Sequence, residues 1–275
     1  MNSALASVIL QRVNELKIQG EKFMIIHSFD DTTDAIISPE KFYVNEEKLC
    51  DVCIIIFSNV VMNNIMKSFR CEEIAVMHAV NGPIPFYKLH YKGKKIAFYM
   101  TMISSTGAGT CIEEARCLIG ARKYIMFGSC GCLDEKIAAG KAIIPTDAYR
   151  DEGFSYHYVP AADYITIRNA DIVAKAFADM EIPHVKGKTW TTDGFYRETK
   201  ANMEKRKNEG CIAVEMECAG VQAVCDFRGL EFYSFLISGD LLDSQEWDKR
   251  ILGDDEETKH QLKSFYIALE LALRI

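Results

Sequence analysis

The sequence lacks an apolar run long enough to span a bilayer, which takes about 20 residues. Runs such as 53–57 are much shorter, so we expect no membrane insertion. Residues 1–20 also lack the pattern of a signal peptide, because Arg12, Glu15 and Lys17 interrupt their apolar side chains. Their spacing predicts an amphipathic helix. We therefore expect a cytoplasmic protein.

Positive charge is scarce as well. The net charge is -7 and no long block of Lys and Arg occurs, so the sequence disfavours nucleic acid as a partner. The 10 cysteines lack a regular framework, which favours reduced thiols over disulfides. Cys50 and Cys53 have the spacing of a zinc or redox pair, but no second pair follows at zinc-site distance. We therefore expect neither a metal nor a redox centre.

Short apolar runs alternate with longer segments of helical periodicity, which predicts a single α/β domain over residues 1–275. Residues 1–50 are expected to form an N-terminal extension packed on this domain or near it. The expected strands are 52–57, 96–102, 123–127, 141–144, 188–191, 212–215 and 232–237. The expected helices are 59–69, 111–118, 171–180, 200–208, 217–227 and 254–274.

Several expected strands end in small or polar residues just before a helix begins, at 104–109, 128–131, 215–218 and 238–240. Ligands of open α/β sheets bind at the carboxyl ends of the strands. The four segments therefore predict one crevice surrounded by hydroxyl groups, free backbone N–H groups and carboxylates. The same residues also suit a purely structural role, with glycines in tight turns and acidic side chains in a helix cap or an exposed turn.

These side chains suit glycosyl transfer from a nucleoside. The ribose becomes oxocarbenium-like as its bond to the base breaks, so a carboxylate such as Glu217 can bind its hydroxyls and stabilise the positive charge. The base leaves as an anion unless an acid of raised pKa protonates it, and Asp240 is the candidate acid. The candidates for holding an incoming anion through their backbone N–H groups are Gly107, Gly109, Gly128 and Ser129.

Three motifs occur in a fixed order along the chain, at 127–131, 214–217 and 238–240. Residues 105–109 and 150–157 add two further matching segments. Together they resemble the hexameric purine nucleoside phosphorylase and uridine phosphorylase family over most of the chain. This resemblance implies a twisted central mixed β-sheet flanked by helices, assembled as a homodimer or homohexamer. It also implies that no metal or organic cofactor is needed.

The resemblance implies a role for each matched residue. Glu217 and Asp240 are catalytic, with Asp240 as the acid that protonates a purine ring nitrogen. The residues implied at the ribose are Met216, Glu217 and Ser129. Those implied at the base are Phe195, Cys130, Gly131 and Arg197. Those implied at phosphate or another anion are Ser58, Gly107, Gly128 and Ser129.

The chain departs from the family at its phosphate-binding arginines. Residues 58–62 and 81–83 contain no arginine where the family has one, and Met126 occupies the position of another. Guanidinium groups bind phosphate through paired, charge-assisted hydrogen bonds, so their loss weakens phosphate binding. Other cations that would be available for an anion site are Arg150, Arg197 and Lys88.

The implied activity is phosphorolysis of a purine or pyrimidine nucleoside to free base and ribose 1-phosphate, with phosphate as a possible co-substrate. Two alternatives stay open because the arginines are missing. The first is a nucleosidase with water as the acceptor, although residues 59–66 lack the glutamate that such relatives place there. The second is a non-catalytic nucleoside-binding protein. The sequence leaves open the base, the 5′ substituent and the oligomer size.

Overall fold

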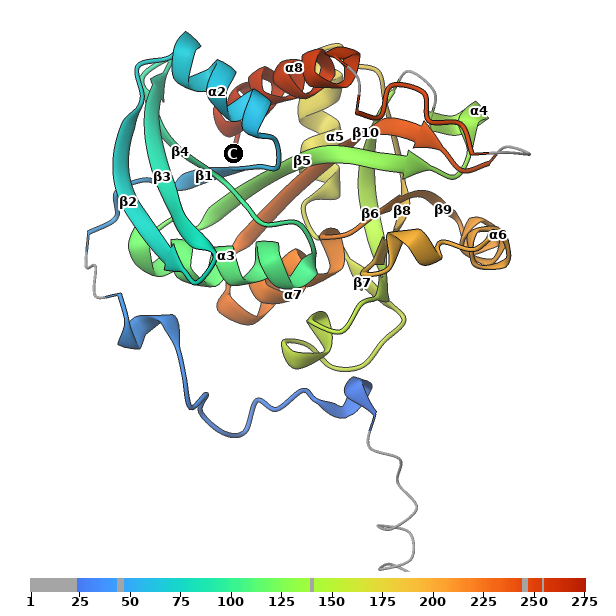
Figure 1. The fold of residues 1–275 in the computed structure, drawn as a ribbon, viewed down its shortest axis with the longest axis horizontal. Helices are drawn as coiled ribbons and strands as arrows, with labels where there is room; N and C mark the ends of the chain where they lie inside the picture. The colour runs from blue at the N-terminus through green and yellow to red at the C-terminus, as the bar shows by residue number, and fades with distance from the viewer. Residues whose placement is uncertain (1–23, 44–46, 139–140, 244–246, 254) are drawn as a thin grey trace, which may run out of the picture.

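The computed structural model describes residues 24–43, 47–138, 141–243, 247–253 and 255–275. The amphipathic helix expected over residues 1–20 lies outside these ranges. Within them, ten strands form one mixed sheet with helices on both of its faces (Figure 1). The α/β architecture predicted from the sequence is therefore confirmed. No helix in the described ranges is long and apolar enough to cross a membrane.

The strands of the sheet are β1 Val52–Ile56, β2 Glu72–Ala79, β3 Gly82–Tyr91, β4 Lys94–Met100, β5 Lys123–Cys132, β6 Ala142–Asp151, β7 Tyr164–Thr166, β8 His184–Thr192, β9 Cys211–Glu215 and β10 Glu231–Leu241. Their order is β10-β6-β8-β9-β5-β1-β4-β3-β2, with β7 paired to β6. Because β10 also pairs with β5, the strands β5, β10, β6, β8 and β9 close into a ring. The ring brings the ends of β5, β9 and β10 together.

The helices are α2 Asn59–Ser68, α3 Ser105–Leu118, α4 Glu135–Ala138, α5 Ala170–Asp179, α6 Lys200–Asn208, α7 Cys218–Arg228 and α8 Asp255–Ala272. In Figure 1, α3 and α7 cover one face of the sheet, and α2, α5 and α8 cover the other. The two faces bury separate apolar cores. Strand β1 contributes to both, with Cys53 and Ile55 on one side and Ile54 on the other, which is why it reads as a continuous apolar run.

The described part of the N-terminal extension contacts α3. Glu40 pairs with Arg116 at 2.5 Å, and the Tyr43 hydroxyl donates a hydrogen bond to Glu114 at 2.5 Å. Figure 1 shows this segment running outside the layers of the fold. It contributes no residue to the cavity described below.

Most expected strands and helices are present with shifted ends, but two expectations about local structure were wrong. Residues 128–131 were expected as a turn, whereas β5 continues through them to Cys132 because β10 pairs alongside. Residues 105–109 were expected as a glycine-containing turn, whereas they form the first turns of α3. The prediction also missed β2, β3 and β7. In β2 and β3 exposed and buried positions mix without clean alternation, so their period was weak.

Helices α3 and α7 cross closely at a glycine. A Cβ atom added to Gly220 would lie 2.5 Å from the Cβ of Ser105 and 3.0 Å from its Cα. Ser105 and Gly220 therefore set how near the two helices approach. This matters for the site because both helices begin at it.

The first prediction concerns this crossing. Gly220→Ala should lower the free energy of unfolding by about 1–3 kcal/mol, because the added methyl group overpacks the helix contact. Denaturant unfolding measures the effect. Gly153→Ala is the matched control, since its Cβ would meet only Ile25, at 3.8 Å. Equal effects of the two substitutions would contradict the tight crossing.

Candidate active site

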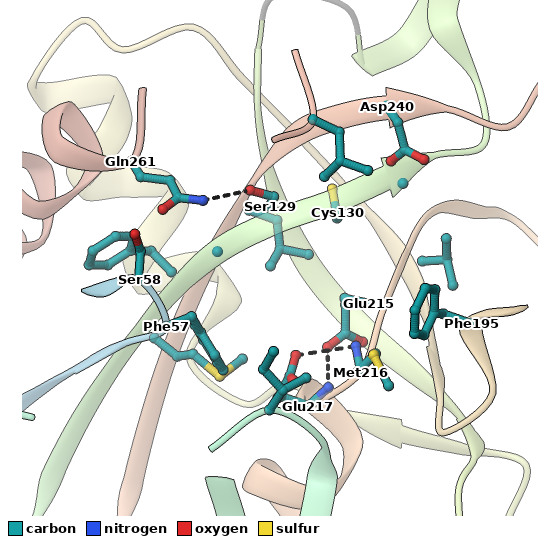
Figure 2. A pocket seen from close by; sticks show the side chains of 18 of the residues that line it. Phe57, Ser58, Ser129, Cys130, Phe195, Glu215, Met216, Glu217, Asp240 and Gln261 are labelled. Atoms are coloured by element: carbon teal, nitrogen blue, oxygen red, sulfur yellow. Dashed lines mark hydrogen bonds between the residues drawn. The ribbon is translucent and has the colours of Figure 1, made fainter. Parts of the chain in front are cut away.

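A cavity of about 470 Å³ lies at the carboxyl ends of β1, β5, β9 and β10 (Figure 2). Further walls come from the start of α2, residues 195–198 and Gln261 on α8. This is where the sequence predicted a crevice. Its volume falls in the range of small-molecule sites, about 300–1,000 Å³.

Glu217 forms one wall of the cavity at the start of α7. Its Oε1 accepts a hydrogen bond from the Ser104 backbone N–H at 2.8 Å, and its Oε2 accepts one from the Met216 N–H at 3.2 Å. Only 8% of the residue is exposed. Burial, followed by the charge of neighbouring Glu215, raises the pKa of Glu217 to about 8. This carboxyl group is therefore largely protonated at neutral pH.

Glu215 holds the junction of β9 and α7 in place. One carboxylate oxygen accepts the backbone N–H groups of Glu217 and Cys218 at 2.7 and 2.6 Å, at the N-terminus of α7. The other oxygen accepts the Thr191 hydroxyl of β8. This one side chain thus ties two strands to the helix and fixes where Met216 and Glu217 lie.

Asp240 forms the opposite wall, near the end of β10, and only 9% of it is exposed. Its Oδ2 accepts the Trp247 indole N–H at 2.7 Å. Phe195, a residue that is 49% exposed, contributes an aromatic ring, and Glu198 lines the cavity three residues further on. Burial, and then the charge of Asp240, raises the pKa of Glu198 to about 7.

The third part of the wall is polar but uncharged. Ser129 on β5 accepts a hydrogen bond from the Gln261 amide at 3.0 Å, and Ser58 caps α2 by accepting the Val61 N–H at 3.3 Å. Gly128 and Gly131 lie on β5 beside them. Cys130 also lines the cavity, and burial raises the pKa of its thiol well above the usual range, which makes it a poor nucleophile.

The cavity lining in the described residues contains four carboxyl groups and no Lys, Arg or His. The carboxyl groups belong to Glu198, Glu215, Glu217 and Asp240. Two of the cations considered from the sequence are used elsewhere. Arg150 donates to the Ser155 hydroxyl and the Pro160 carbonyl, both at 2.7 Å, and Lys88 pairs with Glu72 at 3.1 Å.

Most of the residues predicted for the site come together around this cavity (Figure 2). They are Ser58, Gly128, Ser129, Cys130, Gly131, Phe195, Met216, Glu217 and Asp240. Two do not. Gly107 lies inside α3, where its N–H donates to the Ser104 hydroxyl at 3.1 Å, so the expectation of a free N–H there was wrong. Arg197 is exposed and its side chain is not part of the lining.

Sequence reasoning missed Glu198, Trp247 and Gln261. Glu198 follows Phe195 in a short 3-10 turn, so its nearness to that predicted aromatic residue was the available signal. Trp247 and Gln261 come from the segment beyond the matched motifs. Nothing in their local sequence ties them to Asp240 or Ser129.

The sequence of this chain is similar to those of known proteins. The sequence profile of the Phosphorylase superfamily matches residues 51–273. A DeoD-type purine nucleoside phosphorylase of Caldanaerobacter subterraneus subsp. tengcongensis is 23% identical over 219 residues, covering 78% of this chain and 88% of that protein. DeoD-type purine nucleoside phosphorylases of Bacillus cereus and Bacillus thuringiensis are each 25% identical over 205 residues, covering 74% of this chain and 83% of theirs.

The second prediction concerns the pH dependence of stability. The folded pKa of Glu217, about 8, exceeds the usual 4.5, so its ionisation above pH 4.5 favours the unfolded chain and stability is lost as pH rises toward 8. Glu217→Gln removes this loss. The difference in unfolding free energy between Glu217→Gln and the natural protein should therefore change with pH. It should increase in favour of the variant by on the order of 2–4 kcal/mol between pH 5 and pH 9.

Urea unfolding at pH 5, 7 and 9 measures this difference. Glu204→Gln is the control, because Glu204 is an exposed residue on α6 and should show no such growth. A gain that stays constant with pH would mean that Glu217 titrates like an ordinary glutamate.

Proposed function

The chain belongs to the Phosphorylase superfamily, and from this premise we propose that it cleaves the N-glycosidic bond of a nucleoside with water as the acceptor. The observation that carries the proposal is the composition of the cavity. Glu217 and Asp240 lie on opposite sides of it in Figure 2, and no Lys, Arg or His lines it in the described residues. The volume of about 470 Å³ suits a nucleoside.

The ribose is proposed to bind against Met216 and Glu217. Two vicinal hydroxyl groups can both donate to one carboxylate, and hydrogen bonds to the charged form favour ionisation. Binding of the ribose should therefore release the proton of Glu217. The resulting carboxylate then stabilises the oxocarbenium-like ribose as the bond to the base breaks. Ser129, which lines the same cavity, is proposed to contact the same sugar.

The base is proposed to lie near Phe195, with Cys130 and Gly131 forming the adjacent wall. Gly131 is tightly packed beside Asp240, since a Cβ there would lie 2.5 Å from the Leu242 Cδ1 and 2.7 Å from the Val214 Cγ1. A carboxyl group at this end can protonate the departing base, which would otherwise leave as an anion. No metal or organic cofactor enters the proposed reaction.

The electrostatics of the cavity favour water over phosphate. A phosphate dianion would be transferred from water to a site with four carboxyl groups and no compensating cation in the described lining. Buried charge without a partner is strongly unfavourable. Water carries no such penalty, and the Ser58, Ser129 and Gln261 side chains offer it neutral hydrogen-bonding groups. The proposed products are therefore free base and ribose.

Phosphorolysis is the second candidate, and the names of the relatives favour it. The matched proteins are purine nucleoside phosphorylases, for which phosphate is the acceptor and ribose 1-phosphate the product. A purine nucleoside would then be the expected substrate. This route needs cations from outside the described lining.

We also propose that the protein acts in the cytoplasm as a homodimer or homohexamer, with a small-molecule nucleoside and not nucleic acid as its partner. Two apolar residues of the cavity lining support assembly, since Ile103 is 63% exposed and Phe195 49% exposed. Apolar surface of this kind at a site is commonly covered by another chain.

The third prediction tests the acceptor. Purified protein should release free base from at least one purine or pyrimidine nucleoside at a rate independent of phosphate, with ribose as the sugar product. Chromatography of base and sugar with and without phosphate measures this. Phosphate-dependent release with ribose 1-phosphate would replace hydrolysis by the second candidate. No release from any nucleoside would leave a non-catalytic binding protein.

The fourth prediction tests the role of Glu217. Glu217→Ala should lower kcat/KM for a ribonucleoside by about 100-fold, because hydrogen bonds to a charged group are lost. The loss should be about tenfold for the matching 2′-deoxynucleoside, which lacks one of the two hydroxyl donors. Equal losses of kcat/KM for both substrates would show that Glu217 does not bind the two sugar hydroxyls.

A further inference from the structure

Two carboxyl groups, not one, lie at the end of the cavity where the base is proposed to bind. Asp240 comes from β10, and Glu198 follows the short turn that carries Phe195. They are near enough for the charge of Asp240 to act on Glu198. The resemblance to the purine nucleoside phosphorylase and uridine phosphorylase family implies Asp240 as the proton donor. It implies no role for Glu198.

The surroundings of the two carboxyl groups differ. Asp240 Oδ2 accepts the indole N–H of Trp247 at 2.7 Å, and a donor directed at a carboxyl group favours its ionised form. In the part of the chain that the structure describes, the carboxyl group of Glu198 has no hydrogen-bonding or ion-pairing partner. Glu198 is also partly buried, so its ionised form is poorly solvated.

In the described lining, the other titratable groups that share the cavity with Glu198 include no cation that could favour its ionisation. They are the carboxyl groups of Glu215 and Glu217 and the buried thiol of Cys130. Arg197 is next in sequence, but its side chain is exposed and outside the lining. Adjacent carboxyl groups without a cation retain a proton, and the member of such a pair that accepts hydrogen bonds from a donor ionises first.

We propose that Glu198 holds the proton that is delivered to the departing base, while Asp240 stays ionised beside it as a hydrogen-bond acceptor. This assignment rests on the proposed cleavage of a nucleoside. It makes Glu198 a catalytic residue and Trp247 a positioning residue that keeps the Asp240 carboxylate charged. The pKa of Glu198, raised to about 7, is suited to proton transfer at neutral pH.

In a purine nucleoside, the bond that breaks joins the sugar to the base. The electron pair of the bond between the sugar C1′ and N9 moves into the base, and the Glu198 O–H proton moves to N7. Water adds to C1′ through its oxygen and loses one proton, which returns to the Glu198 carboxylate through solvent. The sum is nucleoside plus water giving base plus ribose.

The first test locates the proton and needs no substrate. In protein labelled with ¹³C at the glutamate side-chain carboxyl carbon, one resonance should titrate near pH 7 and vanish in Glu198→Gln. A second resonance, that of Glu217, should titrate near pH 8, persist in Glu198→Gln and vanish in Glu217→Gln. In Asp240→Asn the first resonance should persist but titrate at lower pH, because the neighbouring negative charge is gone. Absence of the first resonance, or its persistence in Glu198→Gln, would overturn the proposal. Glu204→Gln, in which an exposed residue of α6 is changed, should leave it in place.

The second test is kinetic and compares the best purine nucleoside substrate with its N7-methylated derivative. The methylated base already carries positive charge and needs no proton to leave. Glu198→Gln should lower kcat for the unmethylated substrate by about 10²–10⁴-fold, the range for general acid catalysis, and leave the methylated one within about threefold. The fall of kcat as pH rises through about 7 should also disappear in this variant.

Each outcome separates this assignment from the proposed function. An equal loss on both substrates would mean that Glu198 is only structural, and selective loss in Asp240→Asn instead would return the role to Asp240. If the natural protein cleaves no nucleoside, the proposed function fails, and the carboxyl titration still decides where the proton lies.

Discussion

The carboxylate of Glu215 lies where β9 ends and α7 begins, and the rest of the site depends on how its oxygens are satisfied. It accepts two backbone N–H groups at the N-terminus of α7 and the Thr191 hydroxyl of β8. These bonds fix the turn that holds Met216 and Glu217. Because the Thr191 hydroxyl also accepts the Ala219 N–H, strand and helix are joined twice. The position of Glu217 is therefore set by the fold and not by a flexible loop.

The same arrangement carries an electrostatic cost. Glu217 is buried and lies beside the charge of Glu215, and Glu198 is partly buried and lies near the charge of Asp240. Both acidic side chains consequently have raised pKa values, and no cation in the described lining relieves them. A site of this kind attracts hydroxyl donors and developing positive charge, and it disfavours anions. Raised pKa values of this kind lower the stability of the folded protein as pH rises, because ionisation of these groups favours the unfolded chain.

The family motifs predicted which segments meet at the cavity, but not the local structure of every segment. The motifs at 127–131, 214–217 and 238–240 do converge on one cavity, although the first is a strand and not a turn. Gly107 was misplaced because a glycine in a polar run looks the same whether it forms a turn or the first turn of a helix. The Ser104 hydroxyl decides this by capping α3. At these positions the motif predicts which residues lie near the cavity. The local hydrogen bonds decide whether each residue lies in a strand, a turn or a helix.

The sequence by itself determined the α/β class, most of the strands and helices, and the carboxyl ends of the strands as the place of the site, because these follow from local periodicity and from polar residues at strand ends. Only the tertiary structure decided which side chains meet there. Glu198 and Gln261 line the cavity and Trp247 contacts Asp240, although their segments have no local pattern in common with Asp240 or Ser129. Their contacts arise because β10 pairs with β5 and closes the ring of strands. Which carboxyl group keeps a proton likewise depends on burial and on neighbours distant in the chain, so no local sequence pattern records it.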